Sequence, residues 1–440
     1  MRFFEKLRSQ SFWIKDALTG GKVKQHYNEV KFIFENTDDA EAKELHNKYL
    51  NDLLQHAVAT TPFYSHLRQY KSLADFPVVD KSIVRNNIES HLSAKFNGQK
   101  LFKATTSGST GAPFTVFKDS NKLLRHHAEN IYFADIIDSK LGTRLYYLRV
   151  WNAINRKTPL KSRMQNIVMQ DASNLSDATF EELLRNLQKD KSNKAILAFA
   201  SSLEAFSNFI RRKTDQPLPL KINTVISISE TLPDGAKEIL TKSLSCPVIC
   251  RYSNIENGFL AQQCIAENNE YHLNLASFHF ELLHPEKDEP AAPGEVGRIV
   301  VTDLFNYAMP LIRYNTGDMA ILSEKSACGA QGPVLTKVEG RRVDFIYDTS
   351  DNILSPHVIT NTMWKYAAIV RQFQFIQNAR DHFQLKLNCG NDKFEQTEAL
   401  LSDLKSFVGN DANIEVEFVE DIPLLASGKR KKIINNYRTE

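Results

Sequence analysis

The sequence lacks the features of a secreted, membrane-spanning or nucleic-acid-binding protein. Its 440 residues contain only five cysteines, and this odd, widely spaced set excludes a disulfide framework and predicts reduced thiols in the cytoplasm. No uninterrupted apolar run reaches the roughly 18 residues that a membrane-spanning helix needs, and the stretch MRFFEKLRSQSFWIKD lacks the apolar core of a signal peptide. With 55 Lys and Arg against 52 Asp and Glu, the formal charge of +3 indicates no nucleic-acid partner.

The sequence also lacks internal repeats and low-complexity tracts, which excludes solenoid folds. Helical periodicity dominates as far as about Tyr70. At its start, apolar residues follow a helical pattern, with Phe3, Phe4, Leu7, Phe12 and Trp13. We expect this first helix to dock on its own domain, and contact with a bilayer or a partner is the alternative.

After the helical segment, short β-rich runs alternate with helices. The runs KAILAFA and INTVISIS each precede a helical pattern, and Ser201 and Glu204 have the spacing of a capping box. Such near-continuous apolar strands predict a parallel sheet that is buried on both faces. From about Ile299, strands punctuated by glycine predict a small antiparallel or barrel-like β unit.

The last hundred residues have the pattern of a compact α+β module. Two alternating strands, 383–387 and 414–418, flank a helix that ends at Gly409. One face of that helix carries Leu400, Leu401, Leu404, Phe407 and Val408. The fold class predicted is α/β, with a large N-terminal domain of residues 1–339, a hinge at 340–344 and a small mobile C-terminal domain of residues 345–440.

A loop rich in Ser, Thr and Gly stands out in the stretch ATTSGSTGAPFTVFK, residues 104–118. Consecutive backbone N–H groups in such a loop can converge on an anion, and the hydroxyls add donors. The loop is not a Walker motif, because Gly111 is followed by Ala112 and Pro113 and not by Lys. By composition alone a plain surface turn remains the alternative.

The order of residues in this loop resembles the phosphate loop of the adenylate-forming superfamily, whose members join a carboxylic acid to ATP as an acyl-adenylate. Four further stretches match family motifs in the same order: RYSNIENG (251–258), YNTGD (314–318), GRRVD (340–344) and IPLLASGKRKKI (422–433). Within the superfamily the chain looks most like the phenylacetate-CoA ligase branch, including its CapK-type members of capsule biosynthesis.

The resemblance implies roles for particular residues. The β and γ phosphates of ATP would be held by the loop residues Thr106, Ser107, Gly108, Ser109, Thr110 and Gly111. The adenine would lie against Tyr252 and Ser253, and on its other side against Ser229 and Glu230, where the match to the family is weaker. Asp318 would accept hydrogen bonds from the ribose hydroxyls, and Arg341 would approach the same sugar or the α-phosphate.

Three residues would act in catalysis by this resemblance. Glu256 would bind Mg²⁺, a hard cation that prefers oxygen ligands. Lys429, carried by the flexible Ser427 and Gly428, would bridge the substrate carboxylate and the α-phosphate, and Arg341 would assist. A basic surface tail is the alternative reading of Lys429.

The hinge and a possible metal site depart from the family pattern. Asp344 would be the pivot, but Val343 replaces the first residue of the usual Asp pair. The following segment also lacks a Gly-rich turn of close relatives, so the sequence supports the use of coenzyme A less strongly than it supports adenylation with ATP.

Cys264, His272 and Cys328 resemble three ligands of a structural zinc site that some relatives have. Ser326 replaces a fourth ligand, so we expect a degenerate site without zinc.

The sequence therefore predicts an ATP-dependent, AMP-forming ligase that activates a small carboxylic acid and passes the acyl group to coenzyme A. Transfer to an amine or amino sugar, as in polysaccharide biosynthesis, is the alternative within the same chemistry. A non-catalytic adenylate-binding protein is the alternative of another class. The residues do not specify the acid, the pathway or the oligomeric state.

Overall fold

A computed structural model describes residues 3–106, 114–151, 155–173, 175–265, 269–292, 294–341, 345–390, 394–423 and 430–437. Of Thr106 and Arg341 it describes the backbone alone. The chain divides into two compact units. Unit 1 comprises residues 1–142 and 249–338, and unit 2 comprises residues 143–248 and 339–440. The predicted functional residues at 107–111, 344 and 429 lie outside the described residues.

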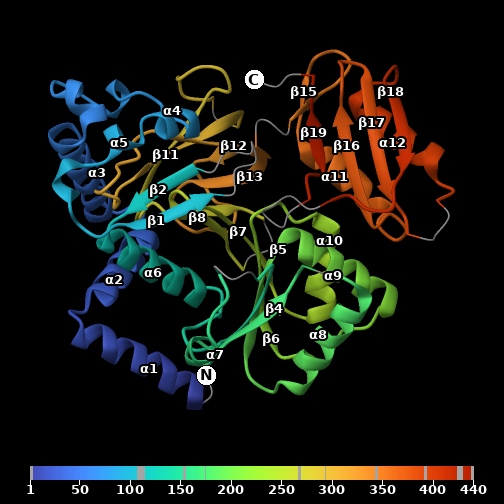
Figure 1. Cartoon of the computed structure of the whole chain (residues 1–440), viewed down its shortest axis with the longest axis horizontal. Helices are drawn as coiled ribbons and strands as arrows, with labels where there is room; N and C mark the ends of the chain where they lie inside the picture. The colour runs from blue at the N-terminus through green and yellow to red at the C-terminus, as the bar shows by residue number, and fades with distance from the viewer. Residues whose placement is uncertain are drawn as a thin grey trace. The chain divides into compact units, whose positions relative to one another are not determined.

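Unit 1 begins with helices, as the sequence predicts. They are α1 (Phe3–Leu18), α2 (Lys22–Glu35) and α3 (Ala40–Thr60), followed by η1 (Pro62–Leu67), η2 (Leu73–Asp75), α4 (Lys81–Asn86), α5 (Ile88–His91) and η3 (Ala94–Phe96) (Figure 1). Asp39 and Asp80 cap α3 and α4, accepting hydrogen bonds from the backbone N–H of Glu41 and Ile83 at 2.8 Å each. A later helix, α6 (Ser120–Asp135), packs on α2 and on strand β8.

The strands of unit 1 form a hairpin and a larger sheet. The hairpin pairs β1 (Phe102–Thr106) with β2 (Phe114–Lys118). In the sheet the strands follow the order β10-β11-β12-β13-β9-β8-β7. Their bounds are β7 (Val248–Asn254), β8 (Gly258–Gln263), β9 (Tyr271–Leu273), β10 (Phe278–Leu283), β11 (Val296–Asp303), β12 (Tyr314–Ser323) and β13 (Val334–Arg341). The antiparallel pairing predicted after Ile299 is confirmed for β11 and β12, whereas no closed barrel occurs among the described strands.

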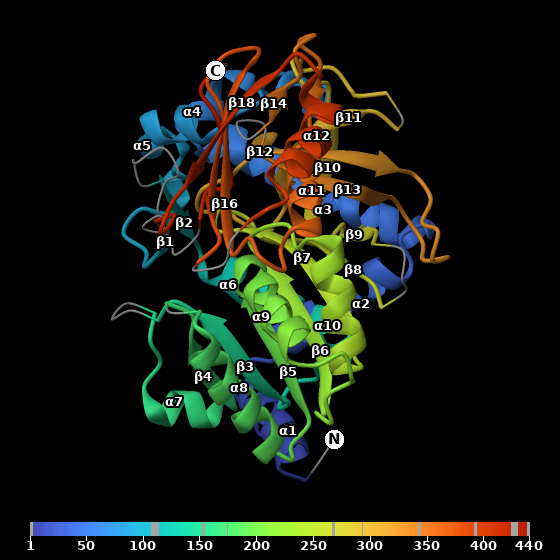
Figure 2. The same cartoon turned by 90° about the vertical axis from the view of Figure 1, so that its right-hand side faces the viewer.

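Unit 2 contains the parallel strands that the sequence predicts (Figure 2). The order is β6-β5-β3-β4, with β3 (Arg144–Arg149), β4 (Ile167–Asp171), β5 (Lys194–Phe199) and β6 (Ile222–Ile228). The connecting helices are α7 (Pro159–Met164), α8 (Asp177–Lys189), α9 (Ala200–Lys213) and α10 (Asp234–Leu244). The predicted capping box is wrong, because α9 already begins at Ala200 and the N–H of Ser201 donates to Glu230 at 3.3 Å.

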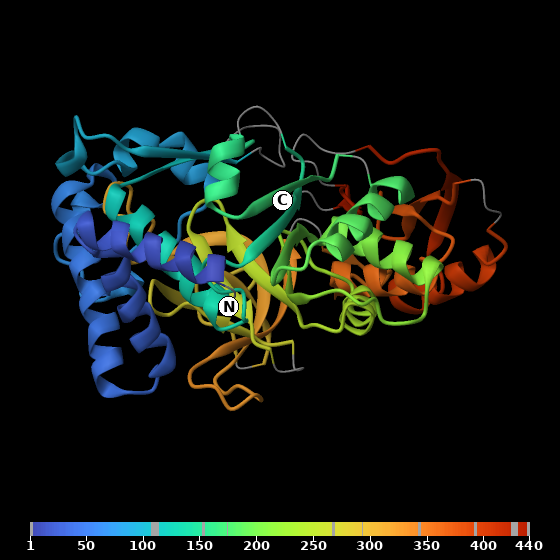
Figure 3. The ribbon, with the colours of Figure 1, turned by 90° about the horizontal axis from the view of Figure 1, so that it is seen from below.

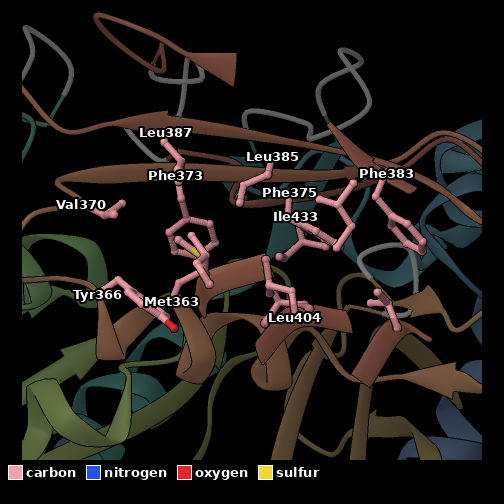
Figure 4. Packing of buried hydrophobic residues seen from close by; sticks show 14 of the residues in the cluster. Met363, Tyr366, Val370, Phe373, Phe375, Phe383, Leu385, Leu387, Leu404 and Ile433 are labelled. Atoms are coloured by element: carbon pink, nitrogen blue, oxygen red, sulfur yellow. The ribbon is translucent and has the colours of Figure 1, made fainter. Parts of the chain in front are cut away.

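The rest of unit 2 is the α+β module that the sequence predicts. Its sheet has the order β18-β17-β16-β19. The elements are β14 (Ile346–Tyr347), β15 (Ile353–Leu354), α11 (Pro356–Lys365), β16 (Gln372–Gln377), β17 (His382–Asn388), α12 (Thr397–Val408), β18 (Asn413–Phe418) and β19 (Ile433–Asn435). Its core joins Phe375, Phe383 and Leu385 to Leu404 (Figure 4). Gly409 ends α12 with a φ of 115°, as expected for a C-terminal glycine.

One face of α12 differs from the prediction. Leu400, Leu404 and Val408 are buried, but the side chain of Phe407 is 43% exposed.

The predicted domain division at 340–344 stays a prediction. In the part of the chain that the structure describes, no helix is long and apolar enough to cross a membrane.

Candidate active site

The Ser/Thr/Gly loop connects the two strands of a hairpin. In this hairpin Thr106 is the Cα partner of Phe114, and the hydroxyls of Thr105 and Thr115 lie 3.1 Å apart. The side chains of Phe114 and Val116 are buried in the core of unit 1. The two ends of the loop are therefore held together by packed strands, whereas residues 107–113 lie outside the described residues.

Tyr252 and Asp318 come from motifs far apart in the sequence, and the structure brings them together. The Tyr252 hydroxyl, at the end of β7, donates to Asp318 Oδ2 on β12 at 2.7 Å. It also lies 3.2 Å from Thr316 Oγ1, which donates to the Ile299 carbonyl at 3.0 Å. Burial, followed by the charge of Asp318, raises the pKa of Tyr252 well above its usual value, so this hydroxyl remains a proton donor.

Glu256 lies in the connection between β7 and β8 and is 1% exposed. Lys81 Nζ is 2.7 Å from its Oε1, and the Tyr314 hydroxyl donates to the same oxygen at 3.3 Å. A parallel β-bridge between Val79 and Tyr314 places the start of α4 beside β12. Sequence reasoning gave no role to Lys81 or Tyr314. Tyr314 belongs to the YNTGD motif, but nothing local marks a lysine at a helix start as a partner of Glu256.

A second cation lies against the same connection. Lys118, at the end of β2, donates through Nζ to the Ile255 carbonyl at 2.7 Å. Burial, and then the nearby positive charge of Lys122, lowers the pKa of Lys118 to about 8. Two lysines that the sequence did not single out thus flank the predicted metal ligand. A buried carboxylate oxygen suits Mg²⁺, so Glu256 fits the cation that the resemblance implies.

The remaining predicted nucleotide residues fall in several places. Ser253 is paired with Phe259 between β7 and β8 in unit 1. Ser229 and Glu230 follow β6 in unit 2, where Ser229 has a positive φ of 77° and Glu230 accepts the Ser201 N–H bond described above. The strain of that φ marks a tight turn at the carboxyl end of a parallel strand. Arg341 ends β13. The roles predicted for these residues stay predictions.

The three predicted metal ligands of unit 1 do converge. The ligand atoms of Cys264, His272 and Cys328 all lie within 4.8 Å of one another, and Cys328 Sγ is 3.4 Å from His272 Nε2. The Ser326 hydroxyl lies 2.7 Å from Glu270 Oε2 and 3.1 Å from Cys328 Sγ. The set provides two sulfur donors and one nitrogen donor, which suit zinc in kind, but a closed structural site needs four ligands. The predicted absence of zinc stays a prediction.

The chain shares most of its length with one curated protein. It is 24% identical to Protein CapK of Staphylococcus aureus over 446 aligned residues, which cover 94% of this chain and 93% of CapK. Residues 346–436 match the family model of the CapK C-terminal domain. A phenylacetate-coenzyme A ligase of Thermus thermophilus is also 24% identical, over 46% of this chain and 40% of the ligase. The chain is a homologue of CapK and of the phenylacetate-CoA ligases.

A solved structure shows the same fold. A 2-hydroxyisobutyryl-CoA ligase in complex with R3-HIB-AMP, in the postadenylation state, matches with a TM-score of 0.71 at 16% identity, over 90% of each chain. This similarity confirms the predicted α/β fold of adenylate-forming ligases, and the homology confirms the family resemblance drawn from the motifs. The phenylacetate-coenzyme A ligase and the 2-hydroxyisobutyryl-CoA ligase are enzymes of the class that the sequence predicts, which supports that prediction.

Proposed function

We propose that this protein is an ATP-dependent, AMP-forming carboxylic acid ligase. The observation that carries the proposal is the meeting of two distant motifs in unit 1. Tyr252 and Glu256 from one motif contact Asp318 and Tyr314 from the other, through hydrogen bonds of 2.7 and 3.3 Å. The family resemblance assigns nucleotide or metal binding to three of these residues, Tyr252, Glu256 and Asp318.

The chemistry requires two anions to meet, because a carboxylate oxygen attacks the α-phosphorus of ATP while pyrophosphate leaves. Catalysis then depends on positioning and on charge stabilisation. Asp318, held by Tyr252, would accept hydrogen bonds from the ribose hydroxyls. Glu256 would hold Mg²⁺, which offsets the negative charge of the phosphates when it is bound. Lys429 would supply the positive charge between the substrate carboxylate and the α-phosphate.

The proposed acyl acceptor is coenzyme A, which the named activities of the phenylacetate-CoA ligase relatives support. A second candidate, an amine or amino sugar, is supported by the CapK similarity. CapK aligns over 94% of the chain, whereas the Thermus ligase aligns over 46%. The C-terminal module, which would carry Lys429, also matches a CapK family model.

An exchange of radioactive pyrophosphate into ATP tests the proposal. The purified protein, offered a panel of aromatic, hydroxy and amino acids, should catalyse exchange with at least one of them, and hydroxylamine should trap that acid as a hydroxamate. Exchange with no acid in a broad panel, together with AMP binding, would favour the non-catalytic alternative. Once the acid is known, adding coenzyme A or an amino sugar identifies the acceptor by the product formed.

A Glu256→Gln variant tests the metal role. The substitution keeps the size of the side chain but removes the negative charge, so exchange should fall by about 10² to 10³-fold, as for loss of one electrostatic contact in a transition state. Raising the Mg²⁺ concentration should recover part of the activity. Glu398→Gln, at an exposed position of α12, is the matched control and should be unchanged. Wild-type exchange in Glu256→Gln would exclude Glu256 as a metal ligand.

A further inference from the structure

Helix α1 presents an apolar stripe to solvent. Five of its apolar side chains are exposed: Leu18 83%, Phe3 73%, Phe4 67%, Ile14 61% and Leu7 47%. At 100° per residue, Phe3, Leu7, Ile14 and Leu18 fall within about 60° of one another around the helix axis, with Phe4 beside them. The stripe therefore runs the whole length of α1, which lies on the viewer's side in Figure 3.

The opposite face of α1 is fixed to unit 1 by polar and aromatic contacts. The buried Asp16 carboxylate accepts hydrogen bonds from the backbone N–H groups of Val23 and Lys24 at 3.1 and 2.9 Å, at the start of α2. The ring of Trp13 packs edge-on against Tyr27 at 5.6 Å. Part of the apolar pattern thus docks on its own domain, as expected from the sequence, but these contacts orient the helix so that the larger apolar stripe faces outward.

The charges on α1 favour one kind of partner. Both of its acidic residues, Glu5 and Asp16, are buried, whereas Lys6 and Lys15 are exposed on the two sides of the stripe. The exposed surface of α1 is therefore apolar with cationic flanks. This is the pattern of a helix that lies in the interface of a membrane, with its apolar face in the acyl region and its lysines among anionic headgroups. Pairing with a second copy of the same stripe would bring like charges together.

We propose that α1 docks this protein on the surface of membranes that contain anionic lipids. The helix lies in the plane of the interface and does not span the bilayer. Phe3, Phe4, Leu7, Ile14 and Leu18 enter the boundary between headgroups and acyl chains. The docking does not depend on the proposed ligase activity, since none of these residues belongs to the candidate active site.

Co-sedimentation of the full chain with vesicles tests the proposal. The wild-type protein should bind vesicles of phosphatidylglycerol and phosphatidylcholine more strongly than vesicles of phosphatidylcholine alone, and salt should weaken the difference. The double variant Leu7→Glu/Ile14→Glu should lower the affinity for the anionic vesicles by about tenfold or more. Lys6→Glu/Lys15→Glu, which changes only exposed charges, should lose the preference for anionic lipid. Phe418→Glu, at another exposed apolar position, should bind like the wild type.

Three results would overturn the proposal. The first is wild-type protein that does not bind the anionic vesicles. The second is unchanged binding by Lys6→Glu/Lys15→Glu, or by a Leu7→Glu/Ile14→Glu variant whose circular dichroism matches the wild type. The third is a dimer in sedimentation velocity that Leu7→Glu/Ile14→Glu dissociates while no variant changes vesicle binding, because the stripe would then be an interface between two copies.

Discussion

The interior of unit 1 and the interior of the C-terminal module are built in opposite ways. Unit 1 buries charged side chains, among them Lys122, Arg125, Asp303 and Glu256. The core of the C-terminal module joins apolar residues such as Phe375, Leu385 and Leu404. Among the described residues of 346–436, no Asp, Glu, Lys, Arg or His side chain is buried.

This difference matches two different tasks. Burying a charge costs free energy unless a partner and hydrogen bonds compensate it, so a fold retains such groups at the expense of stability. In unit 1 two lysines, Lys81 and Lys118, contact the connection that carries Glu256. A nucleotide with its metal would need a fixed electrostatic environment there. An apolar core holds the C-terminal module together without buried charge, which suits a domain that would carry Lys429.

Breaking the buried ion pair of unit 1 should have the largest effect. Lys122 Nζ lies 2.7 Å from Asp303 Oδ1, and both side chains are fully buried. Lys122→Met leaves the Asp303 carboxylate uncompensated and should lower the free energy of unfolding by about 3–5 kcal/mol, measured by urea denaturation. The double variant Lys122→Met/Asp303→Leu should recover much of the loss. If the single variant is as stable as the wild type, the charged interior of unit 1 does not constrain stability as argued here.

Removing Lys429 should affect chemistry without affecting stability. Lys429→Ala should lower ATP–pyrophosphate exchange by about 10² to 10³-fold, because it removes the positive charge proposed to lie between two anions. ATP binding and the urea midpoint should stay at wild-type values. Lys431→Ala, two residues away in the same basic run, is the control. Near wild-type exchange in Lys429→Ala would contradict the catalytic role and favour a basic surface tail.

Truncating a side chain in the apolar core of the C-terminal module should lower its stability, in contrast to the removal of Lys429. Leu404 is fully buried, and Leu404→Ala should destabilise the module by about 2–5 kcal/mol through lost burial and a cavity. Phe407→Ala, on the same helix but 43% exposed, should change stability by no more than about 0.5 kcal/mol. Urea denaturation followed by circular dichroism checks both. Equal effects of the two variants would contradict the packing of α12.

The stability of unit 1 should also depend on pH. Burial lowers the pKa of Lys118 to about 8, compared with 10.5 for an ordinary lysine. Between these values the unfolded chain binds more protons than the folded chain, so the free energy of unfolding should rise as the pH rises through this window. Lys118→Met should flatten that rise, and Lys103→Met, at an exposed position, should keep it. An identical rise in both variants would assign it to other groups.

Much of the fold follows from local patterns in the sequence. The strands KAILAFA and INTVISIS, the alternation at 383–387 and the glycine at 409 each gave the correct element, because periodicity and backbone preference act over a few residues. The predicted capping box at Ser201 is wrong because it considers only neighbouring residues. Its spacing predicts that Glu204 accepts the Ser201 N–H bond, but Glu230, 29 residues further along the chain, accepts it.

The sequence by itself determined the order of the motifs and the α/β class. Through the family resemblance it also predicted that Asp318 binds a nucleotide and that Glu256 binds its metal. Only the tertiary structure decided that Lys81 and Lys118 flank Glu256, and that Tyr252 holds Asp318. It also decided that the apolar stripe of α1 faces outward. Contacts between residues more than sixty positions apart depend on how strands and helices pack, and no local pattern in a single sequence encodes that packing.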